Sequence, residues 1–250
     1  MGSVGAKDIP ELLDANGKRI DGRDLNELRP LKIEAGVLQR ATGSAFVEWG
    51  ENKVMAAVYG PREVHPRHMQ ENTKAVVQCR YNMASFSVDE RKRPGLDRRS
   101  QEISKVIGEA LESVLFVEEY PRTSIGIYIE VLQANAGTRC AGLVAASVAL
   151  ADAGIPMSDL VPAVAVGKVA GKLALDLRKE EDNYGEADVP MALVPKSGRL
   201  VLLQMEGHMT RDELKTAIDM GVQGCHKIYE IQKEALRKRY SIAHDGGDAQ

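Results

Sequence analysis

Three kinds of feature are scarce in this sequence of 250 residues, and each shortage excludes a class of protein. Three cysteines without a CxxC pair indicate neither a disulfide framework nor a zinc ribbon, and they favour a reducing cytoplasm. Aromatic residues make up 4%, too few for a surface that holds single-stranded nucleic acid mainly by stacking. No apolar run approaches the ~18 residues of a membrane span, and no signal peptide is expected at the N-terminus.

The sequence also lacks an excess of positive charge, since its formal net charge is −3. A polyanion could then be bound only by local clusters of basic residues. The remaining composition, 44% hydrophobic and 28% charged, is that of a globular protein. A chain of this length forms one large domain or two small ones.

The hydrophobic pattern predicts an α/β (α+β) fold of two units packed as one compact body. The last predicted helix begins at a capping box formed by Thr210 and Glu213. In chain order we expect a hairpin over 45–59, a strand over 75–81, a helix over 103–115, a strand over 125–131, a helix ending near 154, hairpins over 161–177 and 189–205, and this last helix.

A predicted turn between a strand and a helix carries Gly137, Thr138, Arg139 and Cys140. Free amide N–H groups and the positive end of the helix dipole favour anions at such a place. Gly137 allows close approach of the backbone, Thr138 offers a hydroxyl, and Arg139 adds a cation that fits phosphate. A plain helix cap beside a surface arginine is the alternative. Cys140 is also a weak candidate nucleophile, because no histidine is fixed near it.

A loop over residues 89–99 holds five basic residues. Its Arg98 and Arg99 stand at the predicted start of a helix, where cations oppose the dipole by up to ~1 kcal/mol unless an anion is bound. This conflict favours a bound phosphate, although a solvated charged face is the more common outcome. A second basic loop could likewise bind an anion or form a solvated charged face. Its two histidines are also weak candidates for metal ligands. It contains Arg62, His65, Arg67 and His68.

The stretch over residues 176–188 is acidic. We expect Asp182 and Asp188 just before a strand, where side chains at a sheet edge can converge on a cleft. Paired carboxylates there act as general acid and base, or hold Mg²⁺ together with several waters. A polar connection between two hairpins is the alternative.

Taken in order, these motifs resemble the RNase PH family over roughly residues 18 to 240, and within it the catalytic RNase PH-like subunits of the archaeal exosome. Each motif is weak alone, and the ordered set is specific. The set consists of Arg19–Arg23 with Arg29-Pro30, Gly43–Ala45 with Ala57–Pro61, His65–His68, Asp89–Arg91 with Arg98-Arg99, Ala136–Arg139, and Glu181-Asp182 with Gly185–Asp188.

The resemblance implies the RNase PH fold, in which two βα units of the ribosomal-S5-domain-2-like type pack together. We expect an N-terminal extension over 1–18, a first unit over 19–154, a second unit over 155–240 and a flexible tail over 241–250. The implied activity is phosphorolysis: inorganic phosphate, the co-substrate, attacks the last linkage at an RNA 3′ end and releases a nucleoside 5′-diphosphate, reversibly.

The resemblance also implies roles for single residues. The phosphate site would consist of Arg99, Gly137, Thr138, Arg139 and Cys140. Asp182 would be the general acid, and Asp188 its supporting carboxylate, with both as ligands of any Mg²⁺. RNA contacts would come from Arg98 and from a pore loop with Arg62, His65, Arg67 and His68. The chain departs from related sequences at Cys140, where a serine is frequent, and at Pro190, where polynucleotide phosphorylases have lysine.

The partners implied are a single-stranded RNA 3′ end, an inactive RNase PH-like homologue in a ring of three heterodimers, and RNA-binding cap proteins of the S1/KH type. No membrane is implied. Three alternatives stay open: a non-catalytic RNA-binding ring subunit, a stand-alone bacterial-type RNase PH that trims tRNA, and a metal-dependent hydrolytic nuclease. The presence of both arginines and both aspartates, Arg99, Arg139, Asp182 and Asp188, favours an enzyme.

Overall fold

A computed structural model describes residues 12–14, 17–95 and 97–241 of the chain. Strands and helices alternate along it, as the sequence predicts. The elements are β1 (Leu31–Ala35), β2 (Gly43–Trp49), β3 (Asn52–Glu63), the 3-10 helix η1 (Arg67–Met69), β4 (Val76–Met83), α1 (Arg98–Glu112), the 3-10 helix η2 (Val117–Glu119), β5 (Thr123–Gln133), α2 (Thr138–Asp152), β6 (Ala163–Val169), β7 (Lys172–Leu175), α3 (Lys179–Tyr184), β8 (Ala187–Val194), β9 (Arg199–Leu203), β10 (Glu206–Gly207) and α4 (Arg211–Ser241).

The strands form two sheets. The first has the order β1-β2-β3-β5-β4, and it is mixed because β4 runs parallel to β5 while the other pairs are antiparallel. The second has the order β10-β8-β6-β7, with β9 also paired to β8, and all of its pairs are antiparallel. This confirms the predicted α/β fold class with mixed sheets.

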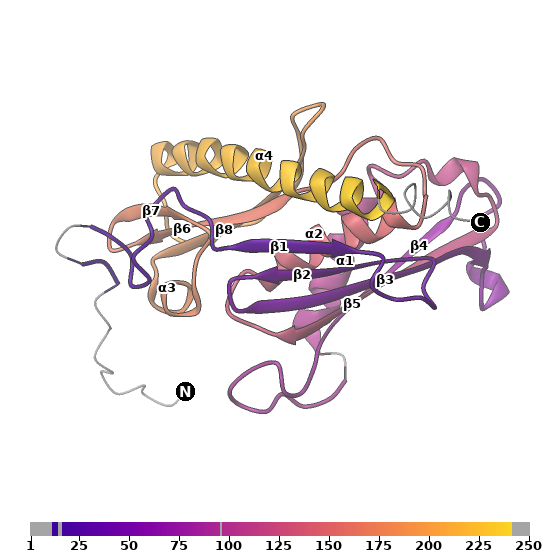
Figure 1. Cartoon of the computed structure of the whole chain (residues 1–250), viewed down its shortest axis with the longest axis horizontal. Coiled ribbons are helices and arrows are strands. Elements are labelled where there is room, and N and C mark those ends of the chain that lie inside the picture. The colour runs from indigo at the N-terminus through magenta and orange to yellow at the C-terminus, as the bar shows by residue number, and fades with distance from the viewer. Residues whose placement is uncertain (1–11, 15–16, 96, 242–250) are drawn as a thin grey trace, which may run out of the picture.

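Helices join the two sheets into one body. Both α1 and α2 contact the first sheet, and α2 also contacts β6 and β8 of the second. The long helix α4 runs along the second sheet and reaches β1 of the first (Figure 1). Because α2 is enclosed by both sheets, it is buried on every side from Cys140 to Leu150, as expected for a helix that is apolar all round.

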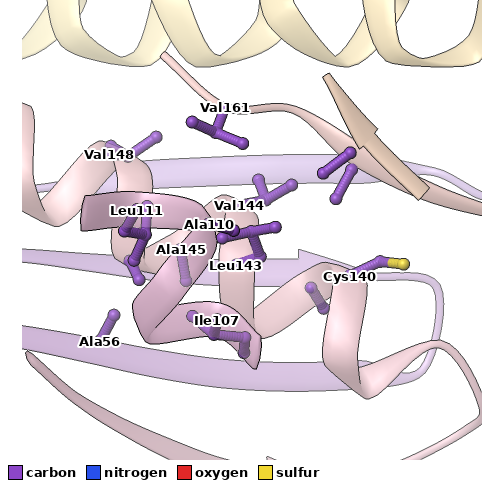
Figure 2. Packing of buried hydrophobic residues seen from close by; sticks show 14 of the residues in the cluster. Ala56, Ile107, Ala110, Leu111, Cys140, Leu143, Val144, Ala145, Val148 and Val161 are labelled. Carbon is purple, nitrogen blue, oxygen red and sulfur yellow. The ribbon is translucent and has the colours of Figure 1, made fainter. Parts of the chain in front are cut away.

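Small residues let α2 approach its neighbours closely. Figure 2 shows Ile107 and Leu111 of α1 beside Leu143 and Ala145 of α2, within a single hydrophobic cluster. At Gly142 a Cβ atom would lie 3.2 Å from Cγ2 of Ile129, which is tighter than an ordinary van der Waals contact, so the glycine lets the helix lie close to the sheet. The apolar stripe predicted for the helix over 103–115 is the face of α1 that takes part in this core.

A buried carboxylate, Asp176, ties the N-terminal segment to the second sheet. Its Oδ2 accepts hydrogen bonds from Arg29 N at 2.7 Å and Trp49 Nε1 at 2.9 Å. Its Oδ1 accepts from Arg29 Nη2 at 2.6 Å, and its carbonyl accepts from Arg19 Nη2 at 2.8 Å. Asp176 is 3% exposed, so these partners replace the water that the charge has lost.

The secondary structure differs from the sequence prediction in one important place. Residues 179–184 form the helix α3, whereas an irregular acidic connection between hairpins was expected. The predicted hairpins and the capping box of Thr210 and Glu213 are confirmed.

At the ends of the chain, α4 continues through Ser241. The rest of the predicted tail and most of the predicted extension over 1–18 lie outside the described residues. The predicted boundary after residue 154 falls between α2 and β6 and stays a prediction. No helix in the described part of the chain is both long and apolar enough to cross a membrane.

Replacing the Asp176 carboxylate tests its structural role. Asp176→Ala leaves the Arg29 guanidinium and the Trp49 N–H buried without their acceptor, and we expect the free energy of unfolding to fall by about 3–5 kcal/mol. Urea titration measures this, with Glu109→Ala as control, because Glu109 forms only an exposed pair with Lys105 on α1 and should change stability by less than ~1 kcal/mol. Equal stability of the two variants would contradict this role.

Candidate active site

The turn between β5 and α2 leaves the start of α2 open. Ala136 and Gly137 adopt left-handed conformations, with φ of 52° and 67°, and α2 begins at Thr138. Gly137 is the N-cap, and no described side chain caps the helix. The Thr138 hydroxyl instead accepts a hydrogen bond from Tyr81 OH at 2.8 Å. The capping alternative therefore does not account for Thr138, and the first-turn amides keep their capacity to bind an anion.

Buried polar side chains hold this turn in place. Asn52 Nδ2 donates to the Ala136 carbonyl at 2.7 Å, and Asn52 Oδ1 accepts from Asn135 N at 2.5 Å. Arg29 Nη1 donates to the Asn135 carbonyl at 2.5 Å. Lys179 N donates to Asn135 Oδ1 at 3.1 Å. Because Lys179 is the first residue of α3, Asn135 connects the turn directly to the helix that carries Asp182.

A cavity of about 590 Å³ lies at the start of α2. It brings together the predicted phosphate residues Arg99 and 137–140 with Asp182 and Asp188, from segments far apart in the sequence. Its polar and turn-forming lining residues are Lys92, Asp97, Arg99, Gly137, Thr138, Arg139, Cys140, Lys179, Asp182, Asn183, Asp188, Pro190 and Glu206.

The cations of the cavity come from the starts of two helices. Asp97 caps α1, where its Oδ1 accepts from Ser100 N at 2.7 Å. The side chain of Ser100, followed by this backbone N–H, lowers the pKa of Asp97 to about 2. Arg99 follows in the first turn and lines the cavity, while the exposed Arg98 does not. Arg139 comes from the first turn of α2 and is largely buried. Two arginines thus face one cavity beside a helix N-terminus, which favours an anion there.

The carboxylates of the cavity come from two neighbouring elements. Asp182 lies on α3, and Asp188 lies within β8, opposite Glu206 of β10. Neither residue precedes its strand as expected, because residues 179–184 are helical and β8 starts at Ala187. Asp188 Oδ1 is buried and has no hydrogen-bond partner among the described residues. An orphaned oxygen of this kind is characteristic of a site that binds or reacts.

Burial and mutual repulsion favour the protonated forms of both carboxylates. Burial, followed by the charges of Asp182 and Glu206, raises the pKa of Asp188 to about 7, against the opposing charge of Arg139. Desolvation at the cavity wall also raises the pKa of Asp182, although that side chain is still open to solvent, and Arg99 is the main opposing charge. The cavity therefore holds carboxyl groups whose pKa values are shifted towards the range in which they donate protons.

Two weaker sequence candidates are not supported. Burial raises the pKa of the Cys140 thiol well above its usual value, which argues against a nucleophilic thiol and leaves the backbone of Cys140 for a ligand. The second basic loop lies away from the cavity: Arg62 Nη2 donates to Tyr128 OH at 3.2 Å, and Arg67 pairs with Glu63 at 3.2 Å. No cluster of three or more His, Cys, Asp or Glu side chains suited to a metal occurs in the described ranges. The roles of Arg62, His65, Arg67 and His68 towards RNA stay predictions.

Sequence reasoning missed four charged residues that line the cavity, namely Lys92, Asp97, Lys179 and Glu206. Lys92 belongs to the predicted basic loop, and Lys179 stands three residues before Asp182. Both therefore lie within or beside motifs that the sequence already indicates. Glu206 had no sequence signal, because only the pairing of β10 with β8 brings it to Asp188.

The fold and this cavity, with arginines and a helix start facing carboxyl groups, suit an enzyme that acts on an anion, and comparison with known proteins identifies the family. Residues 27–156 match domain 1 of the 3′ exoribonuclease family, and residues 159–224 match its domain 2. The chain belongs to this family, the RNase PH family, and the predicted membership is confirmed.

Relatives of high identity cover nearly the whole chain. It is 59% identical over 245 residues to the exosome complex component Rrp41 of Thermococcus onnurineus, covering 98% of each chain. It is 61% identical over 237 residues to that of Methanopyrus kandleri, covering 95% of this chain and 97% of the relative. Among solved structures, rice Rrp46 is similar with a TM-score of 0.79 at 24% identity, covering 88% of this chain and all of that one. An Archaeoglobus fulgidus exosome chain, in a structure with RNA at its active site, is similar with a TM-score of 0.76 at 21% identity, covering 86% and 92%.

The raised pKa of Asp188 has a consequence for stability. Its folded pKa of about 7 exceeds the ordinary value of 3.8, so the folded state binds more protons between these values and loses stability as pH rises through them. Asp188→Asn cannot lose this proton. We expect the variant to gain about 1–4 kcal/mol relative to the parent between pH 4 and pH 8.

Urea unfolding of both proteins at each pH, with a chelator present, measures this gain. The control is Asp219→Asn, because Asp219 is exposed on α4. A difference between Asp188→Asn and the parent that does not depend on pH would show that Asp188 is not protonated in the folded protein.

Proposed function

We propose that this chain is the catalytic, phosphorolytic 3′→5′ exoribonuclease subunit of an exosome ring. It uses inorganic phosphate to release nucleoside 5′-diphosphates from RNA 3′ ends, and the reverse reaction adds tails. The observation that carries the proposal is the single cavity in which Arg99, Arg139 and the start of α2 face Asp182 and Asp188. The presence of all four side chains supports a catalytic rather than a purely RNA-binding subunit.

The cations reduce the electrostatic repulsion between the two negatively charged reactants. Orthophosphate and a phosphodiester repel each other, and a pair of unit charges at ~4 Å costs about 4 kcal/mol at an effective dielectric constant of 20. Arg99, Arg139 and the amides of residues 138–140 hold the phosphate against this repulsion. They remain useful as charge builds on the equatorial oxygens in the transition state.

The aspartates supply the proton that the leaving group needs. A phosphate oxygen attacks the phosphorus of the terminal nucleotide, and the bond to the 3′-oxygen of the preceding nucleotide breaks. Asp182 donates its proton to that departing oxygen, so the shortened RNA ends in a 3′-hydroxyl. Asp188 adds a second carboxyl group to the cavity and helps to keep a proton available for the departing 3′-oxygen. The attacking phosphate becomes the β-phosphate of the released diphosphate.

Magnesium would bind at the same two carboxylates. Mg²⁺ takes one or two carboxylates together with substrate phosphates and water, and the unpartnered Asp188 Oδ1 fits such a ligand. Asp182 would be the second protein ligand. When bound, the ion adds positive charge beside the phosphate oxygens. The proton transfer described above involves only the protein and the RNA.

The partners proposed are those that the family resemblance implies. They are a single-stranded RNA 3′ end, an inactive RNase PH-like homologue that alternates with this chain in a ring of three heterodimers, and S1/KH-type cap proteins. Arg98 and the loop with Arg62, His65, Arg67 and His68 would contact the RNA outside the cavity. We place this assembly in the cytoplasm and describe the chain as two RNase PH units, over 19–154 and 155–240.

Phosphate dependence separates this proposal from hydrolysis. The chain, alone and reconstituted with its RNase PH-like partner, is given 3′-labelled RNA with and without inorganic phosphate. We expect cleavage only with phosphate, with nucleoside diphosphates as the labelled product. Nucleoside monophosphates released without phosphate would instead identify a hydrolytic nuclease.

The acid role of Asp182 is tested by substitution. Asp182→Asn keeps the size of the side chain but cannot donate the proton, and we expect turnover to fall by about 10²–10⁴-fold while RNA binding is retained. Product formation measures the first, and fluorescence anisotropy of labelled RNA measures the second. The control Asp219→Asn, on the exposed side of α4, should match the parent in both. Turnover of Asp182→Asn near that of the parent would remove Asp182 from the mechanism.

A further inference from the structure

Two residues with no role in the mechanism above hold Arg139 in the cavity wall. Arg139 Nη1 donates to Gln204 Oε1, and Arg139 Nη2 donates to Glu102 Oε2 at 3.1 Å. Gln204 Nε2 donates to Glu102 Oε1 at 2.9 Å, which closes a ring of three hydrogen bonds. The Arg139 side chain is only 13% exposed, so this ring determines where its guanidinium lies.

The two supporting residues are themselves anchored near the cavity. Glu102 lies on α1, three residues after Arg99, and therefore on the same side of that helix. Gln204 follows β9, and its backbone N donates to the Pro190 carbonyl in β8 at 3.1 Å. The ring thus connects the helix that carries Arg99, the helix that carries Arg139 and the strand that carries Asp188.

Of the three guanidinium nitrogens of Arg139, Nε alone lacks a hydrogen bond within the described residues. Its Nε is buried and has no hydrogen-bond partner in the part of the chain that the structure describes. A buried N–H without an acceptor is costly, and native proteins pair nearly all of them. Arg139 lines the cavity that also holds Arg99 and the start of α2. Arg139 therefore keeps donor capacity that the described residues do not use, in the wall of a cavity suited to a small anion.

We infer that Glu102 and Gln204 are positioning residues, which hold the guanidinium of Arg139 in the cavity wall where it binds inorganic phosphate. The inference rests on the proposed function, because it assumes that phosphate enters this cavity. An arginine that is already fixed loses little conformational freedom when the anion binds, so the ring favours phosphate binding. The negative charge of Glu102 repels the same anion, so Glu102 can favour phosphate binding only by fixing the position of Arg139.

The test measures the phosphate KM and kcat of phosphorolysis for the reconstituted full-length chain. Glu102→Ala opens the ring, and we expect the phosphate KM to rise about tenfold, the effect of losing one charge-assisted hydrogen bond. The value of kcat at saturating phosphate should fall less. Glu102→Gln keeps an oxygen acceptor for Nη2 and removes the charge, so its KM should return to within about threefold of the parent.

Two further variants separate positioning from a general structural effect. In an Arg139→Lys background there is no guanidinium to hold, so adding Glu102→Ala should leave the phosphate KM unchanged. Glu109→Gln makes the same chemical change on α1 outside the ring, at a side chain that is 66% exposed, and should match the parent. If Glu102→Ala does not fold, Gln204→Met opens the ring from its other side and should raise the KM in the same way.

Calorimetric titration of each protein with inorganic phosphate alone distinguishes the possible failures. If the parent neither binds phosphate nor requires it for cleavage, the proposed function is wrong. If the parent does both, but Glu102→Ala and Gln204→Met bind phosphate as tightly as the parent, only the positioning role is wrong. A fall in kcat with an unchanged KM in either variant also overturns the positioning role.

Discussion

Electrostatic balance in one cavity is the constraint on which the site depends. Attracting phosphate requires fixed positive charge, whereas donating a proton requires a carboxyl group that is not fully ionised. Arg99 and Arg139 oppose the shifts that burial and neighbouring carboxylates impose on Asp182 and Asp188, yet both pKa values remain raised. The cavity thus combines positive charge that favours an anion with carboxyl groups whose pKa values stay above their ordinary range. This balance explains why opposite charge clusters occur together in a chain whose net charge is only −3.

The fold maintains this balance by connecting distant segments through buried polar contacts. Asn135 joins the phosphate turn to α3, and Asp176 joins the N-terminal segment to the second sheet. The ring of Glu102, Gln204 and Arg139 joins α1 to α2 and to the segment after β9. Since each contact crosses between elements, the charged groups are held by the packed body rather than by flexible loops.

Sequence patterns could predict the parts of the structure that local physics determines. The apolar stripe of α1, the hairpins and the capping box of Thr210 and Glu213 follow from spacing alone. Helix α3 was missed because its six residues, KEEDNY, have no apolar period. It depends on the Glu181 carboxylate, which accepts from Arg178 N at 2.8 Å, and on the bond of Lys179 N to Asn135. Gln204 and Glu206 carried no signal, because only the pairing of strands in the second sheet brings them to the cavity.

The location of a bound anion tests the central claim most directly. Crystals of the full-length chain soaked with tungstate, a heavy tetrahedral analogue of phosphate, would show the anion by its anomalous scattering. The account predicts one principal peak in the cavity, within hydrogen-bonding distance of Arg99, the guanidinium of Arg139 and the first amides of α2, and close to Asp182. An empty cavity, with tungstate bound only at other basic surfaces, would contradict it.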